Sequence, residues 1–288
     1  MTRLVSVIVP HYRDLAGLEI CLAALARQTV APHEIVVADN NSPKGEAAVA
    51  SVVAGRARLT VVTEPGAGPA RNGGVAAATG SILAFTDSDC VPQPDWLARG
   101  LDALATCDFV GGAMQVLVAD EQHLTPAEAF ERIFAFDNRN YVLAKGFTVT
   151  ANLFCPRELF DDVGGFRTGV SEDLEWCMRA RGKGYRIGYA ADAVVGHPAR
   201  RTWPEMTKKW ARLDSEAFAL AREAPAGQAK WLLKSLALPF SALAHTPRTL
   251  SDPALARPRD RLNALAMLYR LRAWRTMDSL RLLAGRRA

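Results

Sequence analysis

A short apolar run that ends in two closely spaced aspartates constrains this chain most. Residues 82–85 are too few for a helix and lie between Gly80 and Pro92, so they predict a buried strand of a parallel sheet. Ligands of open α/β sheets bind beyond the carboxyl ends of the strands, where Asp87 and Asp89 follow. Two carboxylates at positions i and i+2 of an extended chain point to one side and suit Mg²⁺ or Mn²⁺. The alternative is a turn or helix cap, because aspartate is common in turns.

The order of apolar runs and amphipathic stretches predicts an α/β fold. Four strands with two intervening helices are expected at residues 4–9, 15–27, 34–38, 47–53, 59–62 and 82–85. This alternation implies right-handed crossovers and a parallel sheet. Helices are expected next at 94–104, 127–141 and 171–181, strands at 108–116 and 185–190, and an extended segment at 148–154.

A glycine-rich loop over residues 66–74 precedes the run at 82–85. It is not a dinucleotide fingerprint, because Arg71 stands where that motif needs glycine, and no Gly-Lys-Ser/Thr of a Walker loop is present. Glycine still lets backbone pass close to a phosphate, and Arg71 offers a forked cation. The alternative is an ordinary turn with a solvated arginine.

A second acidic stretch opens the helix expected at 171–181. Ser171 suits the N-cap, and Glu172, Asp173 and Glu175 in the first turn complement the helix dipole, which is a sufficient structural reason for them. His197 follows a later apolar run. It is either a metal ligand or a loop histidine.

Composition limits the class of protein. With 288 residues and 49% hydrophobic content, the chain can form one large α/β domain and an appendage. Five cysteines with no C-x-x-C pair argue against a disulfide framework or zinc knuckle and favour a reducing compartment. The first apolar run stops at Pro10, so no signal peptide is expected, and no segment reaches the roughly 18 apolar residues that span a bilayer.

Charge divides the chain unevenly. Residues 1–199 hold 17 Lys and Arg against 23 Asp and Glu, whereas residues 200–288 hold 18 against 7. Helices are expected at 203–222, 230–238 and 259–283 of this basic part. Its basic residues alternate with Leu, Trp and Tyr, which fits an anionic membrane face better than nucleic acid. Packing of these helices against the rest of the protein is the alternative.

Six stretches, in this order, resemble the motifs of the family 2 inverting glycosyltransferases, which have the GT-A fold. They are VSVIVPHY (5–12), EIVVADNNS (34–42), GPARNGG (68–74), FTDSD (85–89), GGF (164–166) and ED (172–173). The resemblance covers residues 4–200. It implies a Rossmann-like, mostly parallel nucleotide-binding sheet flanked by helices over residues 1–200. Residues 201–288 match no motif of the family, and their charge and expected helices predict a basic C-terminal helical appendage.

The resemblance also implies a role for each matching residue. Tyr12 would stack on the base, and Asp39 would accept a hydrogen bond from it, which favours uracil. Nucleotide-sugar binding is implied for Pro10, Tyr12, Asp14, Asp39, Asn41, Arg71, Asp87 and Ser88. Metal binding is implied for Asp89 and His197, general-base catalysis for Asp173, and contact with the acceptor or sugar for Asn152, Glu172 and Trp176.

These roles describe an enzyme that uses Mn²⁺ or Mg²⁺ to move one sugar, with inversion, from a UDP-sugar to a saccharide or lipid-linked hydroxyl acceptor. The Gln-x-x-Arg-Trp signature of processive synthases is absent, which favours transfer of a single sugar. We expect a role in cell-surface polysaccharide or glycolipid synthesis, a cytoplasmic protein peripheral on the inner membrane face, and no nucleic acid partner. The alternatives are a polyprenyl-phosphate sugar synthase and a non-catalytic nucleotide-sugar-binding scaffold.

Overall fold

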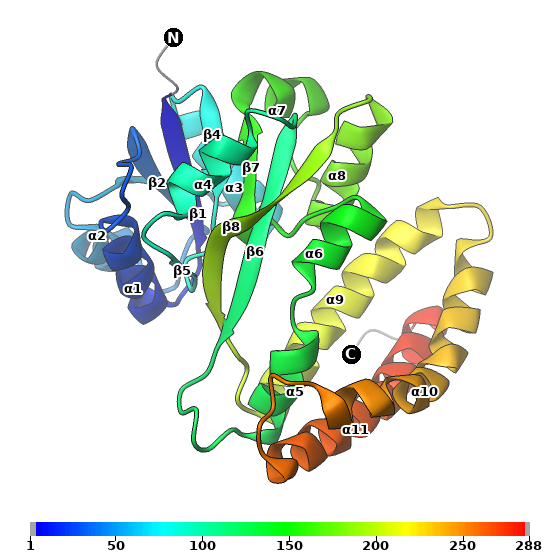
Figure 1. Ribbon diagram of the computed structural model, residues 1–288. Helices are drawn as coiled ribbons and strands as arrows, with labels where there is room; N and C mark the ends of the chain where they lie inside the picture. The colour runs from blue at the N-terminus through cyan, green and yellow to red at the C-terminus, as the bar shows by residue number, and fades with distance from the viewer. Residues whose placement is uncertain (1–3, 286–288) are drawn as a thin grey trace. The chain divides into compact units, whose positions relative to one another are not determined.

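A mixed β-sheet organises the chain up to residue 198 of the computed structural model, in which residues 4–285 are described. Among these residues the sheet has eight strands in the order β3-β2-β1-β4-β7-β6-β8-β5 (Figure 1). They are β1 (Val5–His11), β2 (Glu34–Asp39), β3 (Arg58–Val61), β4 (Ile82–Phe85), β5 (Val91–Pro92), β6 (Phe109–Leu117), β7 (Leu153–Pro156) and β8 (Ile187–Pro198).

Parallel pairing is found at one side of the sheet. β1 pairs in parallel with β2 and β4, and β2 pairs in parallel with β3. Every residue of β1 is buried, as expected for a strand covered on both faces. The pairs β4–β7, β6–β7 and β5–β8 are antiparallel. The predicted α/β sheet is therefore confirmed, and the strands beyond β4 add antiparallel pairs that the sequence pattern does not show.

Helices cover both faces of this sheet. The covering helices are α1 (Leu15–Leu25), α2 (Glu46–Val53), α3 (Ala67–Ala77), α4 (Trp96–Ala103), α7 (Arg157–Val163) and α8 (Glu172–Gly182). Val7 and Val9 of β1 pack in one hydrophobic cluster with α1, α2 and α4. Ile8 packs in a second cluster with α3, α7 and α8. Successive strand side chains thus point to opposite layers, as the pleat requires.

The predicted helix over 127–141 is interrupted. The structure has α5 (Pro126–Phe134), then α6 (Asn138–Asn140) and a π-helical turn over Tyr141–Lys145. The cause is Asn138, whose buried amide donates to the carbonyl oxygen of Gly112 at 2.6 Å and to Thr148 Oγ1 at 2.9 Å. A polar group buried in this way must keep its partners, so these bonds to residues distant in sequence override helix continuity.

Four further segments differ from the sequence pattern. The segment expected to be extended over 148–154 starts with a 3-10 turn over Thr150–Asn152 and becomes β7 only afterwards. The strand expected at 185–190 is β8, which continues to Pro198. Neither β5 nor α7 was predicted. β5 has two residues, and its pairing with β8 is a long-range contact that no local pattern reveals.

Residues 116–136, 169–171 and 198–285 form a second compact unit. Its helices are α5, α9 (Trp203–Glu223), α10 (Gly227–Ser251) and α11 (Pro258–Leu283). Phe130, Met206, Ala242 and Leu268, one from each helix, share a hydrophobic cluster. The expected domain boundary at residue 200 differs from this division, because it assigns residues 116–136 and 169–171 to the first domain. α10 is longer than the helix predicted at 230–238, because two prolines lie inside it without ending it.

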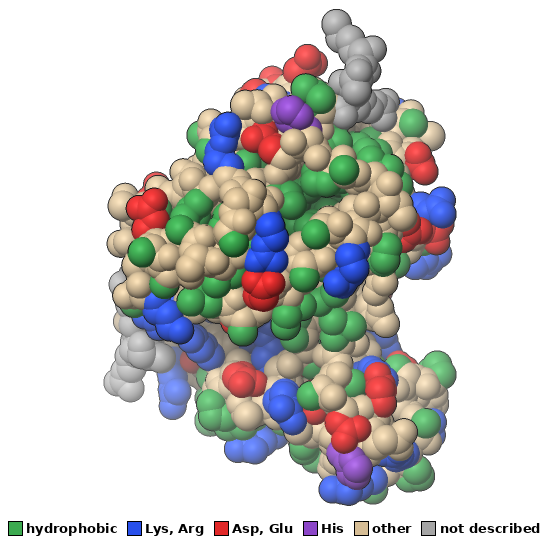
Figure 2. Space-filling model, turned by 90° about the vertical axis from the view of Figure 1, so that its left-hand side faces the viewer, with side chains coloured by type: hydrophobic (Ala, Val, Ile, Leu, Met, Phe, Trp, Pro, Cys, Tyr) green, Lys and Arg blue, Asp and Glu red, His purple; other side chains and the backbone are tan. Residues whose placement is uncertain are grey.

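Side chains of different types are mixed on the surface. On the face drawn in Figure 2, acidic and basic side chains are interspersed among hydrophobic and neutral ones. Within the part of the chain that the structure describes, no helix is long and apolar enough to cross a membrane.

The close approach of α4 to β7 predicts a stability effect at Gly100. A methyl group on Gly100 would lie 2.2 Å from Cζ of Phe154, whose ring is fully buried. We expect Gly100→Ala to lower the free energy of unfolding by about 1–3 kcal/mol in denaturant titrations, because an overpacked core must shift. Gly182→Ala is the control, since no atom lies within 4 Å of its added methyl group. Equal stability of the two variants would contradict this packing.

Candidate functional site

The carboxyl ends of parallel strands bring several predicted residues to one edge of the sheet. β1 ends with Pro10 and His11, β2 ends at Asp39, and β4 ends two residues before Asp87. In the parallel register His11 lies opposite Asp39, and both are buried. The loops that follow these strands are therefore neighbours, at the edge where open α/β sheets bind ligands.

Asp39 is held in a buried polar cluster. Its Oδ1 lies 2.7 Å from Nδ1 of His11 and accepts the hydroxyl of Ser42 at 2.6 Å. Its Oδ2 accepts the backbone N–H of Ser42 at 2.9 Å. Nε2 of His11 is buried and has no hydrogen-bond partner among the described residues. With Nδ1 facing a carboxylate, a neutral His11 presents Nε2 as an acceptor.

The loop after β1 carries two of the predicted nucleotide-binding residues. Tyr12 is 49% exposed, and the Arg13 guanidinium lies 4.7 Å from the centroid of its ring. Asp14 caps α1, where its carboxylate accepts the N–H of Gly17 at 2.9 Å. Asn41, in the loop after β2, is exposed and has a φ of 53°, in the left-handed region that asparagine tolerates.

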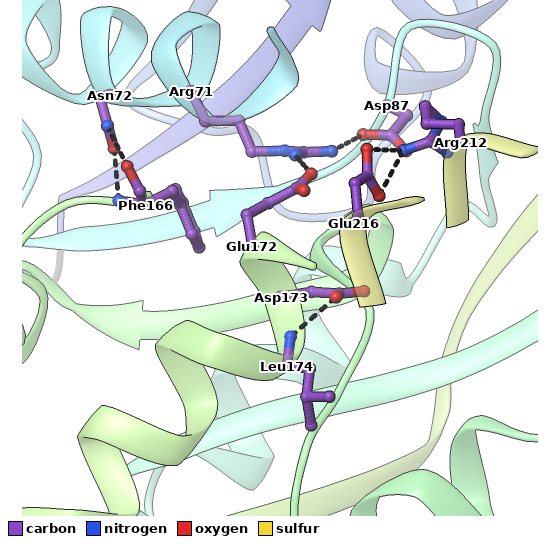
Figure 3. A network of polar contacts seen from close by, with 9 residues as sticks. All are labelled: Arg71, Asn72, Asp87, Phe166, Glu172, Asp173, Leu174, Arg212 and Glu216. Carbon is purple, nitrogen blue, oxygen red and sulfur yellow. Dashed lines mark hydrogen bonds and ion pairs between the residues drawn. The ribbon is translucent and has the colours of Figure 1, made fainter. Parts of the chain in front are cut away.

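Arg71 of α3 bridges two carboxylates from distant parts of the chain (Figure 3). Its Nη2 donates to Oδ1 of Asp87 at 2.6 Å, and its Nη1 donates to Oε1 of Glu172 at 2.8 Å. The side chain is buried, so the alternative of a solvated arginine in an ordinary turn is wrong. The bridge joins the loop after β4 to the first turn of α8.

The pKa of Arg71 follows from this setting. Burial lowers the pKa of a guanidinium, but the carboxylates of Asp87 and Glu172 more than offset that effect. The pKa of Arg71 is therefore raised above its ordinary value, and the side chain stays a cation. Its Nε is buried without a hydrogen-bond partner among the described residues.

Asp89 faces the side chains that could share a cation with it. Nε2 of His197 lies 3.6 Å from Oδ2 of Asp89, and one potential ligand atom each of Asp89, Cys90 and His197 lie within 4.8 Å of one another. Burial, with Asp87 and Asp89 nearby, raises the pKa of the Cys90 thiol well above its usual value. Ser88, between the two aspartates, is buried.

Strand pairing explains how His197 reaches this place. β5 follows Cys90 directly and pairs antiparallel with β8, with Val91 opposite Gly196. The next residue along β8 is His197, which therefore lies beside the Asp89–Cys90 turn. The structure thus joins the two residues that the resemblance assigned to a metal.

Asp173 lies in the first turn of α8 and is half-buried. Its Oδ1 accepts the backbone N–H of Leu174 at 2.7 Å (Figure 3). The helix dipole favours a carboxylate at this position. Since Glu172 precedes it, the Arg71 bridge fixes the segment that carries Asp173 against the loop that carries Asp87.

Two of the predicted contact residues are built into the core. Asn152 is fully buried, where its Oδ1 accepts Nε1–H of Trp96 at 2.9 Å and its Nδ2 donates to the carbonyl oxygens of Ala113 and Ala193. Trp176 is also fully buried and donates to the carbonyl oxygen of Gly164 at 2.9 Å. These bonds give both side chains a structural role.

Sequence reasoning missed three features of the site. His11, Ser42 and Cys90 were not among the predicted site residues. The signal for His11 and Ser42 was weak: each stands at or just beyond a strand end. Glu172 was predicted to meet a sugar, whereas the structure places its carboxylate on Arg71.

Comparison with known families gives a match over most of the site. The family model described as Glycosyl transferase family 2 matches residues 6–175. That range contains the strand ends, the glycine-rich segment, which the structure folds as the first part of α3 and not as a loop, the Asp87–Asp89 turn and Asp173. His197 and Trp176 lie beyond it.

Individual proteins are similar over longer ranges. Glycosyltransferase AglE of Haloferax volcanii is 32% identical over 219 residues, which cover 73% of this chain and 71% of that protein. The pre-mycofactocin glycosyltransferase of Mycobacterium tuberculosis is 29% identical, over 69% of this chain and 44% of its own length. Among solved structures, the mannosyltransferase PcManGT of Pyrobaculum calidifontis, in complex with GDP-Man and Mn²⁺, matches with a TM-score of 0.59. It is 26% identical, and the match covers 98% of this chain and 85% of that one.

The buried bridge predicts that Arg71→Met destabilises the protein. The change leaves two partly buried carboxylates without their cation, and we expect the free energy of unfolding to fall by about 2–3 kcal/mol. Denaturant titration at neutral pH measures the loss. Arg99→Met is the control, because its ion pair with Asp95 is about half exposed and should leave stability nearly unchanged. Similar losses in the two variants would contradict the importance of the bridge.

Proposed function

The chain belongs to glycosyl transferase family 2, and from this premise we propose a metal-dependent inverting enzyme that moves one sugar from a nucleoside diphosphate to a hydroxyl acceptor. The observation that carries the proposal is the Arg71 bridge, which ties the loop of Asp87 and Asp89 to the helix start that carries Asp173. The residues proposed to act on the leaving diphosphate, Asp87 and Asp89, and the proposed proton acceptor, Asp173, are thereby held together at one edge of the sheet.

Asp89 and His197 are the residues that would hold the divalent cation. Their ligand atoms lie 3.6 Å apart and combine a carboxylate oxygen with an imidazole nitrogen, a donor set that suits Mn²⁺. Mg²⁺ is also compatible with the carboxylate and with phosphate oxygens. When bound, the ion would supply positive charge next to the departing diphosphate. The Mn²⁺ in the complex of PcManGT supports the use of a divalent cation.

Arg71 acts in this proposal as a positioning residue. Its Nη1 and Nη2 groups are engaged by Glu172 and Asp87, so it orients these carboxylates and neutralises part of the negative charge at the edge. Without that cation, the carboxylates of Asp87, Asp89, Glu172 and Asp173 would repel an incoming diphosphate. The bridge thus lowers the electrostatic repulsion between the acidic edge of the sheet and an anionic donor.

Asp173 is the proposed general base. The acceptor oxygen forms a bond to the anomeric carbon while its proton passes to the Asp173 carboxylate. The bond between that carbon and the phosphate oxygen breaks, and the diphosphate leaves with the electron pair. One such displacement inverts the anomeric centre, and its transition state resembles an oxocarbenium ion.

Two observations favour different bases in the donor nucleotide. Asp39 favours uracil if one of its carboxylate oxygens accepts a base N–H, although three hydrogen bonds already engage this buried carboxylate. The relative PcManGT was solved with GDP-Man, which favours guanine. Tyr12, exposed beside the edge, would stack on either base.

Two classes of acceptor distinguish the proposed enzyme from a polyprenyl-phosphate sugar synthase. We propose a saccharide or glycolipid acceptor of a cell-surface pathway. A polyprenyl phosphate is the competing acceptor, and a screen of both classes with labelled donor separates them. Inversion is tested by NMR of the product, because a retained anomeric configuration would exclude a single displacement.

Nucleotide binding is the first test. We expect either UDP or GDP, unlike dTDP and CMP, to stabilise the protein in thermal unfolding, and Mn²⁺ to increase the shift. A ligand at about 100 times its dissociation constant adds about 2.7 kcal/mol. Asp89→Ala should abolish the Mn²⁺-dependent part, whereas Asp102→Ala, on an exposed helix position, should keep it. Absence of a shift with every nucleotide would contradict nucleotide-sugar binding, and with it both the proposed enzyme and the nucleotide-sugar-binding scaffold.

Catalysis is tested at Asp173. Asp173→Asn keeps an oxygen for the Leu174 N–H but removes the proton acceptor, so sugar transfer should fall by roughly 10²–10⁴-fold. Release of the nucleoside diphosphate, with water as the acceptor, measures the rate, and the thermal shift shows that the donor still binds. Asp192→Asn, at an exposed position of β8, is the matched control. Transfer near the wild-type rate would refute the assignment of the base.

A further inference from the structure

Six large apolar side chains of α10 are exposed to solvent. Their exposed fractions range from 40% for Leu250 to 71% for Phe240. The set is Leu232, Leu233, Leu236, Phe240, Leu243 and Leu250. Leu233, Leu236, Phe240 and Leu243 follow one another at spacings of three and four residues, and the helical projection places the other two on the same side. We call this side the open face of α10.

The opposite side of α10 already forms the core of its unit. Trp231, Leu238 and Ala242 are buried there, and Trp231 donates to the carbonyl oxygen of Ser279 in α11 at 3.3 Å. A surface helix normally turns a polar side to water. α10 has an apolar side toward the core and a second apolar side toward solvent, so packing within its own unit does not explain the open face.

Basic residues border the open face. On the helical projection Lys230, Lys234 and Arg248 fall along one margin, and α10 contains no acidic residue. Arg270 and Arg281 of α11 are exposed as well. This agrees with the excess of basic residues beyond residue 200, part of which, Arg286 and Arg287, lies outside the described residues.

α11 extends the apolar surface. Leu262, Tyr269, Met277 and Leu280 are exposed along it, and the Tyr269 hydroxyl lies 2.9 Å from Thr246 Oγ1 of α10. Figure 1 shows the two helices side by side. The larger apolar face lies on α10.

We propose that the open face of α10, together with the adjoining exposed side of α11, docks onto an anionic lipid bilayer. Apolar side chains bordered by lysine and arginine are the pattern of a helix that lies in the membrane interface. Acidic lipid headgroups attract such a border. A second copy of the chain is a poorer partner, because a two-fold contact would place these basic borders close together. The proposal concerns the second unit alone and does not depend on the donor or the base.

Vesicle flotation of the full chain tests the apolar component. We expect binding to vesicles of phosphatidylcholine mixed with phosphatidylglycerol, and at least about tenfold weaker binding to phosphatidylcholine alone. The triple variant Leu233→Ser, Leu236→Ser, Phe240→Ser should bind the mixed vesicles at least about tenfold more weakly. Its control is Ile20→Ser, Leu143→Ser, Met178→Ser, which removes comparably exposed side chains from the first unit and should bind as the wild type does. Circular dichroism verifies that both variants fold.

A second pair of variants tests whether the basic residues contribute to vesicle binding. Lys230→Glu with Lys234→Glu should weaken binding more than Arg27→Glu with Lys44→Glu, which changes net charge equally at exposed sites elsewhere. High salt should weaken wild-type binding. Equal binding by the two charge variants, full binding by the apolar variant, or no vesicle binding at all would overturn the proposal. So would a dimer in sedimentation velocity that the apolar variant abolishes, since the open face would then serve self-association.

Discussion

The site depends on one buried cation. Removing the Arg71 guanidinium from water is unfavourable, and two carboxylates that lie 16 and 101 residues away in sequence compensate for it. If either the loop after β4 or the first turn of α8 moves alone, the buried charge loses one of its two carboxylates. A single side chain therefore sets the separation between the residues proposed for the leaving group and the residue proposed for the acceptor proton.

The site also lies where the sheet changes its pairing. β4 has a parallel neighbour, β1, on one side and an antiparallel neighbour, β7, on the other. Residues proposed to bind the nucleotide come from the parallel side, through β1, β2 and their loops. His197 comes from β8 in the antiparallel part, and Asp173 from the helix that precedes β8. The proposed cation ligands, Asp89 and His197, thus come from the two different parts of the sheet.

The sequence predicts the parts of the fold that local pattern controls. Each parallel strand has an apolar run followed by a polar residue, so β1, β2 and β4 and the positions of Asp39, Asp87 and Asp89 could be predicted. The bridge of Arg71, the contact of His11 with Asp39 and the pairing of Val91 with Gly196 join distant residues. No periodicity encodes such contacts, and only the resemblance connected Asp89 with His197. The interruption of the helix near Asn138 could not be predicted, because it depends on a buried hydrogen bond from the Asn138 side chain to the distant Gly112.

The two-residue strand β5 has a consequence for the order in which the protein acquires its parts during synthesis. The parallel strands and the Asp87–Asp89 turn lie within the first 90 residues, whereas His197 takes its place only when β8 pairs with β5. A nascent chain shorter than residue 197 can present Asp89 but not the complete pair of proposed cation ligands. Long-range pairing of this kind forms slowly. Divalent cation affinity would therefore arise late on the ribosome, after most of the nucleotide-binding edge has already been made.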